Sequence, residues 1–141
     1  MRAVRDLIAA WRTHGVALEP PASDADVNRL EVALEAPLPA DLREFYQQAN
    51  GMPHLEYDEH QLSFWSICKI LSESQRSQGH DPNGPFVDLT VGDFLINSWF
   101  VSLRVRNGAV TVFLQGSGEE FSSLSSFAAR YLSAPDSLPV L

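Results

Sequence analysis

The stretch that decides the fold reads Leu38-Pro39-Ala40-Asp41-Leu42-Arg43-Glu44-Phe45-Tyr46-Gln47-Gln48-Ala49-Asn50-Gly51. Pro39 suits the first turn of a helix, because its φ is already helical and its missing N–H would have no partner there. Apolar residues then recur at helical spacing, which predicts one buried face: Leu42, Phe45, Tyr46 and Ala49. Asn50-Gly51 tolerates the left-handed backbone that commonly closes a helix, so we expect the helix to end there.

Two more helices are predicted upstream of this stretch. Apolar residues recur at helical spacing between residues 4 and 11, and Gly15 follows as a C-terminal stop. Ser23 and Asp26 resemble a capping box, and they precede a second apolar stripe over residues 27–34. The N-terminal third of the chain is therefore expected to be helical.

The pattern after Gly51 changes to short, alternating segments. Residues 62–67 are predicted to form a strand, and residues 86–89 and 94–99 two further strands. Residues 72–85 are polar and rich in Gly and Pro, which predicts an exposed, mobile loop with room for one helical turn.

The clearest strand signal surrounds Asn107-Gly108. These two residues supply the positive φ angles of a type I′ turn between Phe100–Arg106 and Ala109–Gln115. One face of this hairpin should pack inward, while the other meets solvent or a partner. A last helix follows, with an apolar stripe over residues 124–132.

The order of these elements predicts an α+β fold, with N-terminal helices packed on an antiparallel β-sheet and a C-terminal helix. The length of 141 residues suits one domain spanning residues 1–141.

The sequence is acidic, with 10 Lys and Arg against 18 Asp and Glu and a formal charge of −8. This charge repels phosphate backbones and anionic membrane surfaces, so neither nucleic acid nor a membrane is expected as a direct ligand. No apolar run approaches the roughly 18 residues of a membrane span, and the N-terminus lacks a signal peptide's apolar block. The only cysteine, Cys68, cannot form an internal disulfide, and we expect a cytoplasmic protein.

Residues 54–60 form the densest polar cluster, with two histidines and three carboxylates. The cluster has three possible interpretations: a metal site, a solvated loop, or an acidic contact surface beside Tyr57. It matches no established ligand spacing. Cys68 has apolar neighbours and should be a packed thiol, and Trp65 and Trp99 should belong to the core. No nucleophile signature is present, so we expect no catalytic, cofactor-binding or metal-binding residue.

The stretch around the third helix resembles the signature of the SUKH superfamily, which includes bacterial immunity proteins and fungal cell-wall regulators. The resemblance rests on Leu38, Pro39, Leu42, Phe45, Tyr46, Asn50 and Gly51. It continues in the family's order through residues 64–67, 91–93 and 126–127. The resemblance implies a helix-flanked antiparallel sheet that serves as a binding scaffold, without catalytic residues or a cofactor.

Many bacterial members of that superfamily neutralise a toxin, so the leading hypothesis is an immunity protein for a cognate toxin, for instance a basic nuclease. The alternatives are an adaptor for an endogenous protein and a small metal-dependent hydrolase built on residues 54–60. The residues expected to contact the partner are Glu56, Tyr57, Asp58, Glu59, Glu119 and Glu120. Changing Phe45 should unfold the protein, whereas changing Asp58 and Glu59 should alter binding alone.

Overall fold

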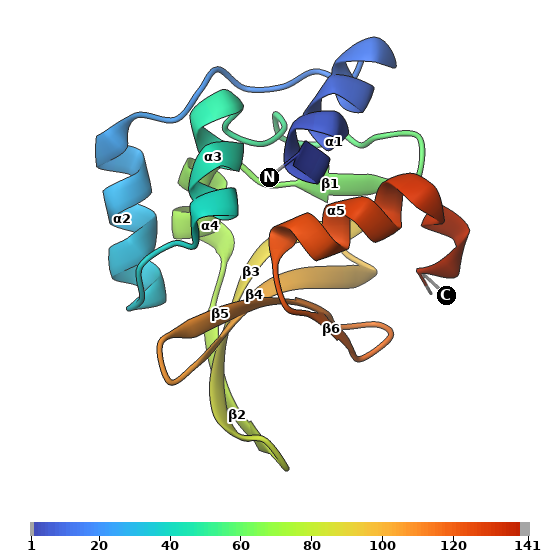
Figure 1. The fold of residues 1–141 in the computed structure, drawn as a ribbon. Coiled ribbons are helices and arrows are strands. Elements are labelled where there is room, and N and C mark those ends of the chain that lie inside the picture. The colour runs from blue at the N-terminus through green and yellow to red at the C-terminus, as the bar shows by residue number, and fades with distance from the viewer. Residues whose placement is uncertain (1, 139–141) are drawn as a thin grey trace.

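A computed structural model describes residues 2–138 of the chain, and its elements follow the predicted order (Figure 1). Three helices come first: α1 (Arg2–Thr13), α2 (Asp24–Leu34) and α3 (Ala40–Gln48). The middle of the chain contains β1 (Leu62–Phe64), α4 (Ile67–Glu73), β2 (Arg76–Asp81), β3 (Gly84–Phe94), β4 (Trp99–Arg106), β5 (Ala109–Leu114) and β6 (Glu119–Phe121). It ends with α5 (Leu124–Ser133) and a 3-10 turn (Pro135–Ser137). The predicted α+β class is confirmed.

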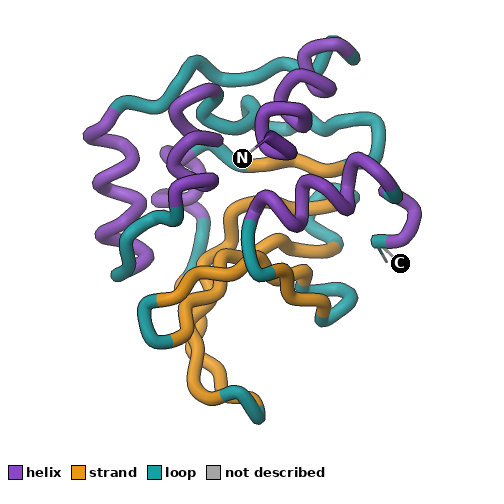
Figure 2. The backbone as a smooth tube through the Cα atoms, in the orientation of Figure 1, coloured by secondary structure: helices purple, strands orange, loops and turns teal. Residues whose placement is uncertain are grey.

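The six strands form one antiparallel sheet in the order β1-β3-β4-β5-β6. The long strand β3 has two partners along one edge, because β1 pairs with its last residues and β2 with its first. An irregularity between Thr90 and Gly92 separates the two pairings. Figures 1 and 2 show α1, α3 and α5 on one side of the strands, and the β2–β3 hairpin extending away from these helices.

The predicted inner face of α3 lies at the centre of the core. Phe45 and Tyr46 are fully buried, and the Phe45 ring packs 6.0 Å from Trp11 in α1 and 5.2 Å from Phe64 in β1. The cap of α2 is also as predicted, since the Ser23 hydroxyl accepts a hydrogen bond from the backbone N–H of Asp26. No helix within residues 2–138 is long and apolar enough to cross a membrane.

Asn50 and Gly51 do not close α3 in the way predicted. The helix ends earlier, at Gln48, and Ala49 has extended backbone. Gly51 does have a positive φ of 69°, but a Cβ there would lie 2.5 Å from the carbonyl oxygen of Trp65. The Asn50 side-chain oxygen accepts a hydrogen bond from the backbone N–H of Ile67. The two residues therefore fasten the end of α3 to the segment that follows β1.

The strand predicted at residues 62–67 is shorter than expected. It ends at Phe64, because Ser66 accepts a hydrogen bond from the backbone N–H of Lys69 and so begins α4. The prediction of a loop at residues 72–85 is also wrong, and this segment is mostly regular structure. It contains the end of α4 and strand β2, whose exposed polar residues lack an alternating apolar pattern.

A single strand, β3, replaces the two strands predicted between residues 86 and 99. The segment expected to be the second of these strands is largely the β3–β4 turn, where three consecutive residues, Leu95, Ile96 and Asn97, have positive φ angles. These conformations are uncommon for apolar residues, so the sequence did not indicate a turn.

The hairpin at Asn107-Gly108 is confirmed, with φ angles of 49° and 79°. Val101 and Leu103 face inward and are buried, as predicted. The opposite face does not simply meet solvent, because Arg104 is only 6% exposed. Its guanidinium lies 3.6 Å from the ring centroids of both Phe86 and Phe113. It also donates two hydrogen bonds to Asp88, so this arginine is a packed part of the sheet.

Candidate functional site

The loop between α3 and β1, residues 52–61, is organised by a buried carboxylate. Asp58 is 5% exposed, and its Oδ2 accepts hydrogen bonds from Trp11 Nε1 at 2.9 Å and the Tyr131 hydroxyl at 2.6 Å. Its Oδ1 accepts from the backbone N–H groups of His60 and Leu62. Asp58 therefore ties the loop to α1 and α5. This burial argues against the expectation that Asp58 can be changed without loss of stability, because a buried charge needs its hydrogen bonds.

Asp58 also affects its neighbour in α5. Burial raises the pKa of the Tyr131 hydroxyl far above its ordinary value, and the negative charge of Asp58 raises it further. Tyr131 therefore stays protonated and serves as a hydrogen-bond donor.

A second buried carboxylate connects the same loop to the β3–β4 turn. Asp93 is fully buried and accepts hydrogen bonds of 2.7 Å from Trp65 Nε1, the Tyr57 hydroxyl and the backbone N–H of Asn97. Burial raises the pKa of the Tyr57 hydroxyl above its ordinary value, and the hydrogen bond to Asp93 raises it further. The backbone N–H of Leu95 also donates to the carbonyl of Gln61. The loop and the turn are therefore held as one unit.

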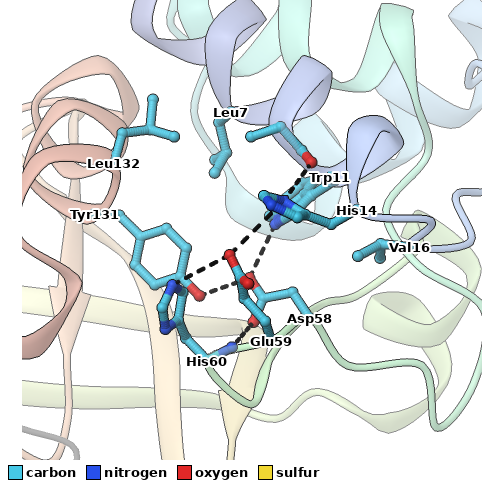
Figure 3. A pocket seen from close by; sticks show the side chains of 10 residues that line it. Leu7, Trp11, His14, Val16, Asp58, Glu59, His60, Tyr131 and Leu132 are labelled. Carbon is cyan, nitrogen blue, oxygen red and sulfur yellow. Dashed lines mark hydrogen bonds and ion pairs between the residues drawn. The ribbon is translucent and has the colours of Figure 1, made fainter.

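A small pocket of about 150 Å³ opens beside Asp58, between α1, the loop and α5 (Figure 3). Its lining is mainly apolar around a few polar groups: Leu7, Ala10, Trp11, His14, Val16, Asp58, Glu59, His60, Tyr131 and Leu132. Figure 3 shows the exposed carboxylate of Glu59 between two imidazoles, 3.7 Å from His14 Nδ1 and 3.5 Å from His60 Nε2. An exposed carboxylate beside apolar walls can receive a cationic side chain with an aliphatic stem.

The other acidic residues expected to contact a partner are engaged within the chain. Glu56 accepts a hydrogen bond from the backbone N–H of Ala17, and Tyr57 is bound to Asp93 as described. Glu119 pairs with Arg130 at 2.7 Å, and Glu120 pairs with Arg106 at 3.0 Å. Glu119 and Glu120 lie in β6, whereas residues 56–59 lie on the loop before β1, and β1 and β6 are the two ends of the strand order. The structure thus separates the predicted acidic surface into two parts.

Two exposed apolar side chains stand on the unit held by Asp93. Leu55 has a φ of 65° and is 63% exposed, and Ile96 has a φ of 52° and is 64% exposed. The left-handed conformation costs an ordinary residue roughly 1–2 kcal/mol, and the branched Cβ makes it especially unfavourable for isoleucine. Sequence reasoning had no signal for this feature, because neither residue is a usual left-handed residue such as Gly or Asn.

The histidines of the loop do not assemble a metal centre. His54 Nδ1 lies 3.3 Å from the Lys69 ammonium, and the His60 ring packs edge-on against Tyr131. Within residues 2–138 no group of three or more His, Cys, Asp or Glu side chains is arranged to hold a metal ion.

The structure also decides the packing of three residues that the sequence left ambiguous. Cys68 is exposed, which corrects the expectation of a packed thiol, because the helix α4 turns Ile67 and Ile70 inward and Cys68 outward. Trp65 is buried in the core, as predicted, and Trp99 is partly buried against it.

The fold and the site define an α+β domain in which buried carboxylates hold the loops at one end of the sheet in fixed positions. Residues 21–131 match the SMI1 / KNR4 family (SUKH-1), and the chain belongs to this family. Proteins of this family are commonly immunity proteins of polymorphic toxin systems. No curated protein matches the chain. The helix α1, which supplies Trp11 and His14 to the pocket, precedes the matched residues.

Proposed function

We propose that this protein is an immunity protein that binds a cognate bacterial toxin in the cytoplasm of the cell that makes both. The observation that carries the proposal is the match of residues 21–131 to the SMI1 / KNR4 family. The formal charge of −8 adds to it, because an acidic protein associates rapidly with a basic toxin, such as a nuclease. Binding over the toxin's active site would block its substrate without any chemistry by the immunity protein.

The contact surface proposed for the toxin centres on Glu59. Its carboxylate is exposed at the mouth of the pocket, whereas Asp58 below it is buried and holds the loop in place. Glu56 and Tyr57 shape the same loop through their hydrogen bonds. Glu119 and Glu120 form a second acidic part of the proposed surface. A partner that contacts them must either leave their ion pairs with Arg130 and Arg106 in place or displace these arginines.

A protection assay tests the proposal. The protein encoded by the open reading frame next to this gene is expressed in a sensitive bacterium with and without this protein, and survival is counted. We expect survival with the wild-type protein, and a purified complex of the two chains. Failure to protect against that toxin, together with no detectable complex, would refute the proposed function.

Charge reversal tests the proposed contact surface. Glu59→Lys should weaken the complex at least about tenfold, because it places a cation opposite the basic side chain that the pocket receives. Glu73→Lys is the matched control, because Glu73 is exposed at the end of α4 and this substitution changes the net charge by the same amount. Equal affinities for the two variants would exclude Glu59 from the contact.

A further inference from the structure

Strand β2 forms an exposed edge of the sheet. Within residues 2–138 it pairs with β3 alone, in an unbroken register that runs from Arg76 opposite Leu89 to Asp81 opposite Gly84. Four of its six residues are exposed, and Figures 1 and 2 show the β2–β3 hairpin extending away from the helices. The side of β2 that faces away from β3, its free edge, is therefore accessible to another strand.

The register with β3 decides which backbone groups the free edge presents. In an antiparallel pair, residues that exchange N–H···O=C bonds with the partner strand alternate with residues whose N–H and C=O point away from it. His80 lies opposite Pro85, which has no N–H, so this pair exchanges no such bonds and the backbone groups of His80 point outward. By alternation, the groups of Gln78 and Arg76 point outward as well.

The two edges of the sheet differ in how they are protected against pairing. Natural edge strands are commonly short, charged, bulged or interrupted by proline. The edge strand β6 has three residues, and two of them, Glu119 and Glu120, are paired with arginines. The centre of β2, residues 77–80, contains no Asp, Glu, Lys, Arg or Pro, and its register has no bulge. This edge therefore fits pairing with a further strand.

The outward-facing residues suit a second copy of β2. They are placed symmetrically about Gln78, so a two-fold axis there sets Arg76 of each copy opposite His80 of the other, and Gln78 opposite itself. Each outward N–H then meets a C=O of the facing strand. The two Gln78 amides also match, because an amide both donates and accepts. A register shifted in either direction leaves Arg76 or His80 opposite a residue outside β2.

The charges at this edge do not oppose such a pairing. Arg76 pairs with Glu35 of the same copy at 2.6 Å. Asp81 likewise pairs with Arg106 at 2.6 Å. The two-fold register places no two carboxylates and no two arginines directly opposite each other, so it avoids the like-charge pairs that destabilise a sheet. The net charge of −8 on each copy lies mainly outside this contact.

We infer that this protein forms a two-fold dimer in which β2 pairs antiparallel with β2 of a second copy, centred on Gln78, so that two six-stranded sheets become one. The contact is small, so the dimer should form and dissociate readily. The inference goes beyond the proposed function and does not depend on it. The pocket beside Glu59 lies between α1, the loop and α5, and the hairpin points away from both helices, so the dimer leaves this pocket uncovered.

A charge swap at position 78 tests the partner and the register together. Analytical ultracentrifugation of the wild type between about 10 µM and 1 mM should show a reversible equilibrium of monomer and dimer. Gln78→Lys and Gln78→Glu each set like charges opposite across the two-fold axis and should weaken the dimer about two- to fivefold, whereas a mixture of the two variants should restore it. A wild type that stays monomeric over this range would overturn the inference. A mixture that dimerises no better than either variant alone would do the same.

Proline variants test which backbone groups make the contact. Gln78→Pro removes an N–H that points away from β3, so the β2–β3 pairing should survive. The dimer loses a hydrogen bond from each copy and should weaken at least about tenfold. Ser77→Pro is the matched control, because it removes an N–H that faces β3, and it should lower the unfolding temperature more than Gln78→Pro does. Wild-type dimer affinity in Gln78→Pro would refute the inference. Neither experiment involves a toxin, so the dimer and the immunity function can fail separately.

Discussion

Replacing Asp58 by Asn, and Glu59 by Gln as a control, distinguishes the residue that holds the loop in place from the residue proposed to contact the partner. The substitution keeps the shape of the side chain and removes its charge. In the wild type, one oxygen accepts from Trp11 Nε1 and the Tyr131 hydroxyl, and the other accepts from two backbone N–H groups. Asn has only one acceptor oxygen, and its NH2 group donates.

The magnitude follows from this count of partners. With its oxygen turned toward the two backbone N–H groups, the amide points its NH2 group at Trp11 Nε1, which can only donate, and at the Tyr131 hydroxyl, which can also accept, so at least one hydrogen bond to a charged acceptor is lost. Each such bond contributes about 1.5–3 kcal/mol, so Asp58→Asn should lower the free energy of unfolding by at least about 1.5–3 kcal/mol. That loss is a large part of the roughly 5–15 kcal/mol by which a typical domain is stabilised.

Urea unfolding at neutral pH measures this loss, with circular dichroism and tryptophan fluorescence as two independent probes. Glu59→Gln is the control, because it removes the same charge from the next residue, which is exposed. That variant should change the free energy of unfolding by less than about 0.5 kcal/mol. A loss below about 1 kcal/mol in Asp58→Asn, or equal losses in both variants, would refute the reasoning.

Three further predictions concern stability. Phe45→Ala should lower the free energy of unfolding by about 3–5 kcal/mol in urea titrations, since its ring is fully buried. Gly51→Ala should destabilise more than Gly15→Ala in thermal unfolding; both glycines have positive φ, but only at Gly51 would the new Cβ collide with backbone. Hydrogen bonds from Arg106 lower the pKa values of Asp81 and Glu120. The stability they add is complete above about pH 5 and is lost as pH falls through the lowered values, so Arg106→Gln should lose less stability between neutral and acidic pH than the wild type. Equal acid sensitivity of the two proteins would contradict that assignment.

The sequence predicted the helices and the hairpin because their signals are local. The Ser23 cap and the positive φ angles of Asn107-Gly108 depend on residues a few positions apart. Strand β2 was missed for the opposite reason. It is polar and exposed, and only its pairing with β3 makes it a strand. Gly79 in β2 shows this dependence, since a Cβ there would lie 2.3 Å from the Phe86 ring of the facing strand.

By itself, the sequence determined the α+β class, the core face of α3, the acidic charge and the resemblance to the SUKH superfamily. Only the tertiary structure decided which acidic residues are buried. In the sequence nothing distinguishes Asp58 from its exposed neighbour Glu59. The hydrogen-bond donors that bury Asp58, Trp11 and Tyr131, lie 47 and 73 positions away along the chain. The burial of a charge depends on donors that distant segments bring to it, and the left-handed backbone at Leu55 and Ile96 depends on the segments joined by Asp93. Neither dependence leaves a local pattern in the sequence.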